Sequence, residues 1–249
     1  MEIIARLRGP EGCPWDRKQT HDSLKPYFIE EVYEAIEAID SKEPHHMADE
    51  LGDVLLQIAL HSQIASENGE FTIEDVINCI SEKMIRRHPH VFGDIRVKDA
   101  DEVLINWEKI KKVEKKDQEG PSMMASIQEG LPALYRSSKI QRKAAGVGFD
   151  WPDWKGAWEK VTEEIGELQE EIDSGATRER LTEEFGDILF ALVNVGRKIG
   201  IDAEDALRLT NRKFIKRFHH VEKRVSESGK GFEDHSLEEL DVYWEEAKL

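Results

Sequence analysis

This chain of 249 residues contains an internal repeat, which limits its possible folds more than any other pattern in it. Four short segments recur in the same order, and the pairs are residues 30–40 with 163–173, 49–55 with 183–189, Lys83–Arg87 with Lys213–Arg217, and Trp107-Glu108 with Trp244-Glu245. The offsets within the pairs are 133, 134, 130 and 137 residues, and loops of variable length produce such differences. The sequence therefore predicts two copies of one structural unit.

Each copy is expected to be helical, since alternating β-branched runs are absent and stretches rich in Glu, Lys, Leu, Ile and Ala are long. Capping residues and glycines predict helices at about residues 23–40, 45–66, 72–87 and 100–116 in the first copy and at about 153–173, 177–199 and 202–229, with a short last helix from Ser236, in the second. Apolar residues at helical spacing are expected to pack inside a bundle, for example Ile188, Leu192, Val195 and Ile199. The predicted fold class is all-α, with about four helices in each unit.

The join between the copies is expected at residues 117–130. This region follows a charged stretch and carries Gly, Pro and Ser, a composition typical of a linker. Residues 131–150 contain spaced apolar side chains, so they fit a leading helix of the second copy. We therefore predict a first domain at residues 1–116 and a second at residues 131–249.

The acidic charge of the chain disfavours one class of partner. Asp and Glu outnumber Lys and Arg by 52 to 35, and a formal net charge of −17 disfavours binding to duplex nucleic acid. The two cysteines, Cys13 and Cys79, form no CxxC pair, and no apolar run reaches the roughly 20 residues that span a bilayer. The beginning of the chain also lacks the apolar segment of a signal peptide. We expect a cytoplasmic protein that does not enter a membrane.

Each copy carries two pairs of carboxylates at helical spacing. Glu-x-x-Glu is followed by Glu-x-x-Asp, which gives Glu31, Glu34, Glu50 and Asp53 in the first copy and Glu164, Glu167, Glu184 and Asp187 in the second. Residues three apart share a helix face, so two antiparallel helices can bring four carboxylates together. Such a cluster needs a cation, and oxygen ligands without Cys or His favour Mg²⁺, with Mn²⁺ possible. One such motif is usually solvated surface, but its recurrence in both copies favours a metal site.

Basic residues at helical spacing fit a polyphosphate. Each copy has a lysine and an arginine four residues apart, which together offer phosphate a point charge and a planar fork. A further arginine precedes the second acidic motif by one turn, and each copy ends near a tryptophan that is able to stack on a base. The candidate nucleotide-binding residues are Lys83, Arg87, Trp107, Arg180, Lys213, Arg217 and Trp244. An ordinary basic patch and tryptophans that only pack against helices are the alternatives.

Several further segments resemble the MazG family of nucleoside triphosphate pyrophosphohydrolases. They are Gly12–Asp16, Arg87–Gly93 and Gly146–Trp151, and together with the acidic repeats the resemblance covers almost the whole chain. It implies two tandem MazG-like units of the all-α nucleotide pyrophosphatase fold. In that fold two chains complete each helical bundle, so the resemblance also implies a homodimer.

The resemblance also implies roles for individual residues, chiefly in the second unit, which it marks as the main catalytic one. The implied metal ligands are Glu164, Glu167, Glu184 and Asp187, and the implied nucleotide contacts are Lys213, Arg217 and Trp244. Arg180 stands where the family often has a lysine. The first unit keeps equivalent residues, so it is expected to be a second active site or a nucleotide-binding unit.

The expected reaction is Mg²⁺-dependent hydrolysis of an NTP or dNTP to the monophosphate and pyrophosphate, in a house-cleaning role. Water attacks the α-phosphorus, and Glu163 or Glu183 is the candidate catalytic base that orients it. The alternatives are a di-iron carboxylate bundle, a helical module that docks a basic partner, and a dUTPase-like or phosphoribosyl-ATP-hydrolysing specificity. The di-iron bundle is disfavoured because it uses Glu-x-x-His, whereas both second motifs here are Glu-x-x-Asp.

Overall fold

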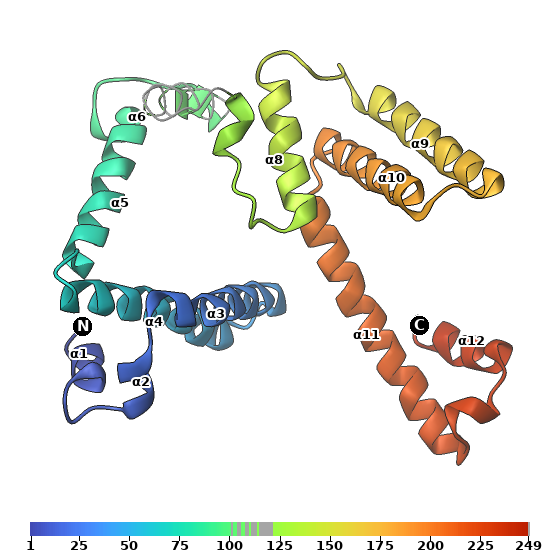
Figure 1. Cartoon of the computed structure of the whole chain (residues 1–249), viewed down its shortest axis with the longest axis horizontal. Helices are drawn as coiled ribbons and strands as arrows, with labels where there is room; N and C mark the ends of the chain where they lie inside the picture. The colour runs from blue at the N-terminus through green and yellow to red at the C-terminus, as the bar shows by residue number, and fades with distance from the viewer. Residues whose placement is uncertain (101, 104–105, 108–109, 111–113, 115–121, 249) are drawn as a thin grey trace. The chain divides into compact units, whose positions relative to one another are not determined.

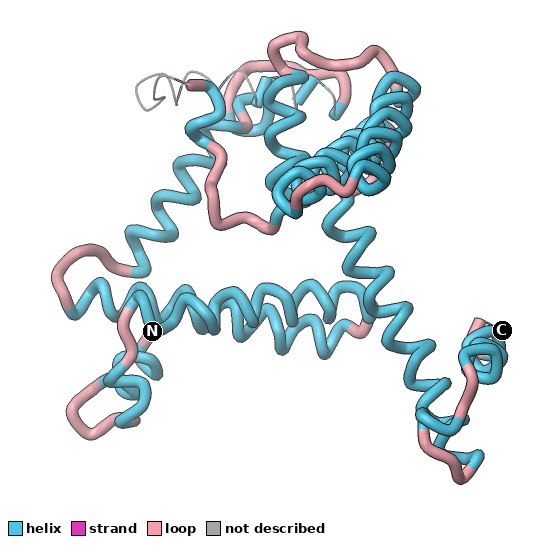
Figure 2. Tube along the Cα trace, turned by 45° about the vertical axis from the view of Figure 1, so that its right-hand side comes forward, coloured by secondary structure: helices cyan, strands magenta, loops and turns pink. Residues whose placement is uncertain are grey.

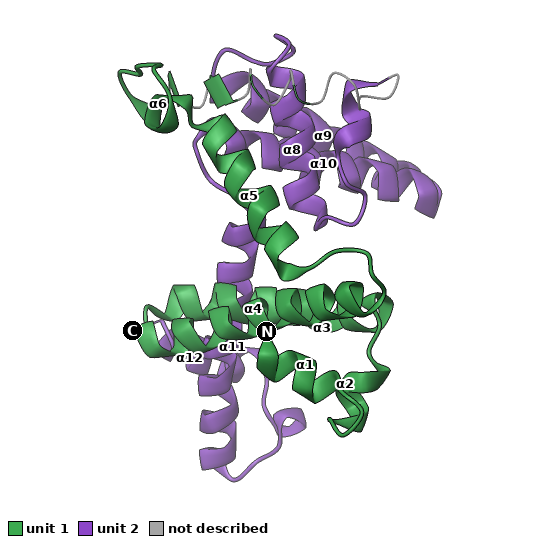
Figure 3. Ribbon diagram, turned by 90° about the vertical axis from the view of Figure 1, so that its left-hand side faces the viewer, with its two compact units in different colours: residues 1–116 green, residues 117–249 purple. Residues whose placement is uncertain are grey.

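The computed structural model describes the chain except for residues 101, 104–105, 108–109, 111–113, 115–121 and 249. The described part consists of helices and loops without a strand, as Figure 2 shows by colour. It divides into unit 1, Met1–Lys116, and unit 2, Asp117–Leu249 (Figure 3). The all-α prediction is confirmed. Among the described helices, none is long and apolar enough to cross a membrane.

Unit 1 is built around a hairpin of two long helices. Its helices are α1 (Glu2–Arg8), α2 (Pro14–Lys18), α3 (His21–Ser41), α4 (Pro44–Glu67), α5 (Ile73–Arg87) and α6 (Pro89–Phe92). α3 and α4 pack along each other, and α1 contacts α4 (Figure 1). The buried core of this unit consists of Ile4, Leu24, Leu60 and Ile64.

The predicted helices of unit 1 agree with α3, α4 and α5, whereas the two short amino-terminal helices were not predicted. The predicted helix at residues 100–116 lies largely outside the described residues, although its described positions, such as Val103 and Trp107, are helical. α5 begins as the sequence predicts, because Thr72 and Asp75 form a capping box. Short helices such as α1 carry too few residues to give a strong periodic pattern.

The side chain of Arg8 links the two amino-terminal helices to the end of α4 through hydrogen bonds. Its side chain is only 7 % exposed, and its Nε and Nη2 atoms lie 3.0 Å and 2.7 Å from the carboxylate oxygens of Glu67. Its Nη1 atom donates to the main-chain carbonyls of Asp16 and Gln19. One buried guanidinium therefore joins α1, the end of α2 and the end of α4.

Unit 2 contains a second long hairpin followed by a long single helix. Its elements are η1 (Met123–Ser126), α8 (Ala133–Ala145), α9 (Trp154–Ser174), α10 (Arg178–Lys198), α11 (Ala203–Ser228), η2 (Phe232–Asp234) and α12 (Leu237–Glu246). α9 packs along α10, α8 contacts α10 and α11, and α12 packs on α11 (Figure 1). The short helix η1 lies within the predicted linker and contacts α8.

The helices of unit 2 begin and end at the residues that the sequence marks. Asp153 accepts a hydrogen bond from the main-chain N–H of Lys155 at the start of α9, and Gly175 ends that helix at φ 69°. Thr177 caps α10 in the same way. Ser236 caps α12 in a capping box with its third helical residue, as predicted.

The apolar surface of the α9–α10 hairpin is only partly covered by the chain. Ala157, Val161, Ala191 and Val195 form its buried core. The predicted apolar stripe on α10 is only partly buried, because Leu192 and Ile199 remain 44 % and 52 % exposed. The same holds in unit 1, where Leu51 and Leu55 on α4 are exposed. A two-helix layer has two faces, and in the described part of each unit the hairpin keeps large apolar side chains exposed.

Candidate metal and nucleotide site

Helices α9 and α10 bring three of the four predicted metal ligands of unit 2 together. One carboxylate oxygen from each of Glu164, Glu167 and Glu184 lies within 4.8 Å of the other two. Glu164 and Glu184 are each 5 % exposed, whereas Glu167 is at the surface. Asp187, three residues after Glu184, is exposed and does not belong to this group. Three converging oxygens, two of them buried, form a donor set that suits a hard divalent cation.

Two basic side chains already compensate these carboxylates. Lys160 Nζ lies 2.6 Å from Glu164, and Arg180 Nη2 lies 2.7 Å from Glu184. Hydrogen bonds from Lys160 to Glu163 and Glu164 raise the pKa of the lysine. The sequence analysis missed Lys160, although its position four residues before Glu164 was a usable signal.

The third carboxylate is not compensated in this way. Burial raises the pKa of Glu167, and the nearby charges of Glu164 and Glu184 raise it further, although Lys160 opposes them. A raised pKa means that the surroundings disfavour the negative charge of Glu167. An additional cation between these carboxylates would relieve that penalty.

Arg180 forms ion pairs with three carboxylates of the same chain. Its Nη1 atom lies 2.8 Å from Glu183, and its Nη2 atom lies 3.1 Å from Glu171 and 2.7 Å from Glu184. The two candidate bases are therefore both in ion pairs, since Glu163 lies 2.8 Å from Lys160. For Arg180 to bind a phosphate, it must first leave one or more of these carboxylates.

Unit 1 assembles an equivalent cluster on α3 and α4. One oxygen from each of Glu31, Glu50 and Asp53 lies within 4.8 Å of the other two, while the exposed Glu34 is outside the group. Burial raises the pKa of Glu31, and the charges of Asp53 and Glu34 add to this effect. The repeat therefore reproduces three of four predicted ligands in both units, with a different member left out.

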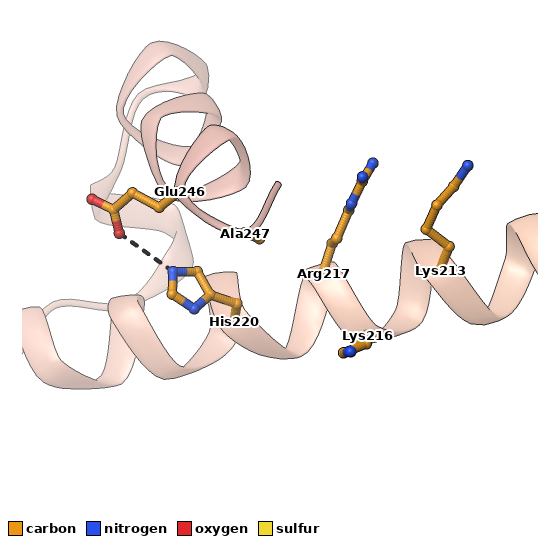
Figure 4. Close-up of a pocket in the computed structure, with 6 residues that line it drawn as sticks. All are labelled: Lys213, Lys216, Arg217, His220, Glu246 and Ala247. Atoms are coloured by element: carbon orange, nitrogen blue, oxygen red, sulfur yellow. Dashed lines mark hydrogen bonds and ion pairs between the residues drawn. The ribbon is translucent and has the colours of Figure 1, made fainter. Parts of the chain in front are cut away.

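A groove beside α11 contains the basic pair of unit 2. It has a volume of about 420 Å³ and is lined by Lys213, Lys216, Arg217, His220, Glu246 and Ala247 (Figure 4). Figure 4 shows Lys213 and Arg217 pointing to the same side of α11, with Lys216 on the other side. Among the described residues, no carboxylate lies within ion-pair distance of Lys213 or Arg217. Both cations are thus available to an anion.

In both units the predicted tryptophan packs on the predicted arginine. The guanidinium carbon of Arg217 lies 5.8 Å from the ring centre of Trp244, and that of Arg87 lies 6.0 Å from Trp107. Trp244 also contacts the ring of Phe214, with 4.9 Å between ring centres. The packing role of Trp244 is therefore real, and its half-buried ring leaves part of its surface for a ligand.

The basic pair of unit 1 has a different environment. The Nη2 atom of Arg87 lies 2.6 Å from Glu114, and Arg86 pairs with the same carboxylate. Lys83 is half-buried on the same helix, α5. The sequence analysis did not identify Glu114, which has no counterpart in the aligned repeat segments.

The carboxylates and the basic pair of unit 2 lie on different helix pairs. The carboxylates belong to the α9–α10 hairpin, whereas Lys213 and Arg217 belong to α11, against which α12 packs (Figure 1). In the part of unit 2 that the structure describes, no ion pair or hydrogen bond joins the two groups. The structure therefore brings together the residues of each group, but it does not bring the two groups into contact.

Comparison with known proteins assigns the chain to a family. The MazG nucleotide pyrophosphohydrolase domain matches residues 19–92 and 156–222, which include both carboxylate clusters. The chain is 50 % identical over its whole length to the nucleoside triphosphate pyrophosphohydrolase/pyrophosphatase MazG of Thermotoga maritima, of which it covers 94 %. It is 42 % identical to the nucleoside triphosphate pyrophosphohydrolase of Escherichia coli K12, covering 95 % of it, and 55 % identical to the protein YabN of Bacillus subtilis, covering half of it. The chain thus belongs to the MazG nucleotide pyrophosphohydrolase family.

Proposed function

We propose that the chain hydrolyses nucleoside triphosphates to a nucleoside monophosphate and pyrophosphate, with unit 2 as the main catalytic unit. The observation that carries this proposal is the converging carboxylates of Glu164, Glu167 and Glu184, two of them buried, in the same unit as Lys213 and Arg217, which pair with no carboxylate among the described residues. Acidic ligands for a cation and basic ligands for phosphate are the two requirements of a metal-dependent phosphate hydrolase. The names of the Thermotoga and Escherichia relatives support the same reaction.

Mg²⁺ is the proposed cofactor, with Mn²⁺ able to replace it. Glu164, Glu167 and Glu184 would hold it, and Asp187 lies three residues beyond Glu184 on the same helix. The donor set fits because it consists of oxygens and because Glu167 has a raised pKa in the cluster without a cation. When bound, Mg²⁺ supplies positive charge at the phosphate oxygens and lowers the pKa of water.

The side chains of the protein position the substrate and accept the proton. Lys213 and Arg217 neutralise the β- and γ-phosphates, and Trp244 offers the exposed part of its ring to the base. Water attacks the α-phosphorus, the bond to the bridging oxygen of the β-phosphate breaks, and pyrophosphate leaves with the electron pair. Glu163 or Glu183 takes the proton of the water once its ion pair with Lys160 or Arg180 opens.

We also propose a homodimer. Large apolar side chains remain exposed on the outer face of the α9–α10 hairpin, including Ile165, Phe185 and Leu189. Exposed apolar faces of this kind are typical of protein interfaces, and a second copy supplies a matching surface by symmetry. Pairing of two hairpins would complete a four-helix bundle.

The biological role that we propose is removal of unwanted canonical or damaged nucleotides in the cytoplasm. The breadth of such a role predicts activity on several NTPs and dNTPs. A panel of these nucleotides with Mg²⁺ tests the breadth, and the preferred base and sugar would come from the ratios of kcat/KM.

Product analysis tests the reaction itself. Anion-exchange separation after incubation with Mg²⁺ and ATP is expected to yield AMP and pyrophosphate. Glu167→Gln is expected to lower kcat at least a hundredfold, whereas Glu170→Gln, an exposed glutamate on the same helix outside the carboxylate group, is the matched control. Release of ADP and phosphate would contradict the proposed bond cleavage. Activity without any divalent cation would contradict the metal role.

A further inference from the structure

Helix α12 depends on a small number of side chains for its place on α11. It has ten residues, none of them buried, and it packs on α11. A helix of this length is marginal in water without such packing. Ring contacts supply part of the packing, since Trp244 lies 4.9 Å from Phe214 and the ring of Tyr243 lies 5.2 Å from the guanidinium carbon of Arg224. Each further contact between the two helices therefore matters for where α12 lies.

Glu246, the last residue of α12, supplies the polar link to α11. Its Oε2 atom accepts a hydrogen bond from Arg224 Nε at 2.9 Å and lies 3.3 Å from His220 Nε2. In the described part of the chain, no other side chain of α12 makes a hydrogen bond or an ion pair with α11. Loss of this one carboxylate would therefore leave α12 without a polar side-chain link to α11.

This link matters for the groove because the same turn of α12 carries Trp244. The ring centre of Trp244 lies 5.8 Å from the guanidinium carbon of Arg217, a member of the basic pair of unit 2. Figure 4 shows Glu246 and His220 at one end of the groove, with the basic pair farther along α11. The last turn of a helix frays readily. The contacts of Glu246 therefore hold Trp244 beside the residues that would bind the phosphates.

A carboxylate in this groove could also act by repelling phosphate. The charge of Glu246 is shared with Arg224 and His220, and it is not within ion-pair distance of the basic pair. The two roles differ in sign. If Glu246 repelled phosphate, its removal would strengthen nucleotide binding, whereas loss of a positioning contact would weaken it.

The internal repeat keeps the tryptophan in both copies but the carboxylate only in the second. The offset of 137 residues that relates Trp107 to Trp244 puts Lys109 in place of Glu246. A lysine cannot accept a hydrogen bond from an arginine. This difference agrees with the proposed role of unit 2 as the main catalytic unit.

We propose that Glu246 is a positioning residue for the nucleotide, which holds the last turn of α12 through Arg224 and His220 and so keeps Trp244 in place for the base. The proposal rests on the proposed function in assigning the base to Trp244. Glu246 itself touches neither the phosphates nor the reacting atoms. It therefore strengthens binding of the nucleoside part of the substrate, without changing the affinity for the phosphate chain or the rate of bond cleavage.

Calorimetric titration of the full chain with Mg²⁺ and a non-hydrolysable ATP analogue tests the proposal, with inorganic tripolyphosphate as a probe that has no base. Glu246→Ala is expected to weaken binding of the analogue about fivefold, a modest effect because the ion pair with Arg224 is partly exposed. Binding of tripolyphosphate should stay unchanged. In ATP hydrolysis, KM should rise by a similar factor at constant kcat.

The neighbouring glutamate provides the matched control. Glu245 pairs with Lys248 and not with α11, so Glu245→Ala is expected to bind the analogue like the unmodified chain. Glu246→Gln keeps an oxygen that accepts from Arg224, and it is expected to weaken binding less than Glu246→Ala does. In a Trp244→Ala background, Glu246→Ala is expected to cause no further loss, because Glu246 acts through Trp244.

Glu246→Asp keeps the test decisive if Glu246→Ala does not fold. It retains the charge but shortens the side chain by one methylene, so it too is expected to weaken binding of the analogue. Tighter binding in Glu246→Ala, equal weakening of the analogue and tripolyphosphate, unchanged binding in Glu246→Asp, or a further loss in the Trp244→Ala background overturns the proposal. A chain that binds the analogue as expected but does not release pyrophosphate from ATP would contradict the proposed function alone.

Discussion

Arg87 donates two hydrogen bonds to one oxygen of Glu114, from Nε at 3.0 Å and from Nη2 at 2.6 Å. Together with Arg86, it lowers the pKa of Glu114 to about 2, and the larger effect comes from Arg87. In unit 2 the equivalent Arg217 lies over Trp244, without a carboxylate at ion-pair distance among the described residues. The two units therefore offer a phosphate different charges at equivalent positions.

Removing the Glu114 carboxylate is expected to strengthen nucleotide binding to unit 1. The change is Glu114→Gln in an Arg217→Ala background, which weakens the site of unit 2. Because the Glu114 side chain is 18 % exposed and its second partner Arg86 is 55 % exposed, solvent partly screens these ion pairs, and the expected gain in affinity is about threefold. Calorimetric titration with Mg²⁺ and a non-hydrolysable ATP analogue measures it. Glu227→Gln removes a carboxylate from Arg224 rather than from a phosphate-binding arginine, so it should show no gain.

Lys160→Met is expected to let unit 2 bind a divalent cation without nucleotide. The substitution leaves the buried Glu164 without its 2.6 Å ion pair, so the apo protein loses stability and an added cation restores it. Thermal unfolding with and without Mn²⁺ should show a larger metal-induced rise in Tm for the variant than for the unmodified chain. Lys155→Met, on the same helix but without a carboxylate partner in the described residues, is the control. An equal rise in all three proteins would show that Lys160 does not compete with the cation.

Asp150 is expected to make the stability of unit 2 depend on pH in acid. Hydrogen bonds from Arg197 and, to a smaller degree, Lys198 lower the pKa of Asp150 from 3.8 to about 2. A depressed pKa stabilises the folded state above the unfolded value and loses this effect as pH falls through the folded value, here between pH 4 and pH 2. The difference corresponds to about 2 kcal/mol in the free energy of unfolding.

Urea unfolding of Asp150→Asn and the unmodified chain measures this contribution. The free energy of unfolding of the variant should be lower by about 2 kcal/mol at pH 7, and this difference between the two proteins should become smaller toward pH 2. A difference in unfolding free energy that stays constant across this pH range would show that the variant loses stability through altered packing and not through the charge of Asp150.

The exposed apolar face of α10 is expected to form the dimer interface. Phe185→Asp places a charge on this face and should convert a dimer to a monomer in sedimentation equilibrium. Phe149→Asp is the control, because Phe149 is even more exposed but lies in the loop before α9. An unmodified chain that sediments as a monomer at micromolar concentration would contradict the proposed dimer.

Much of the fold follows from local sequence signals. Asp153, Gly175 and Thr177 mark the ends of helices because capping and left-handed backbone depend on the residue itself and its near neighbours. The extent of burial did not follow, since Leu192 and Ile199 share an apolar stripe with Val195 but remain exposed. Periodicity identifies the face of a helix that is apolar, but it does not say whether the same chain covers that face.

The carboxylate groups were predictable because their spacing of three residues fixes them on one helix face. Which of the four ligands converge depends on side-chain positions, and Asp187 and Glu34 lie outside the groups that form. The contact of Glu114 with Arg87 links residues far apart in the sequence, so no spacing rule reveals it. Helical spacing could have identified Lys160, because it lies four residues, or one turn, before Glu164.

The guanidinium of Arg8 has implications for how unit 1 forms during translation. Arg8 and Glu67 are separated by 59 residues, so α1 leaves the ribosome well before the carboxylate that anchors it. A helix of seven residues does not persist alone in water. The amino-terminal segment can therefore pack in its final position only after α4 has been synthesised. In contrast, α9 and α10 are adjacent in the sequence, so their hairpin can form as soon as α10 emerges.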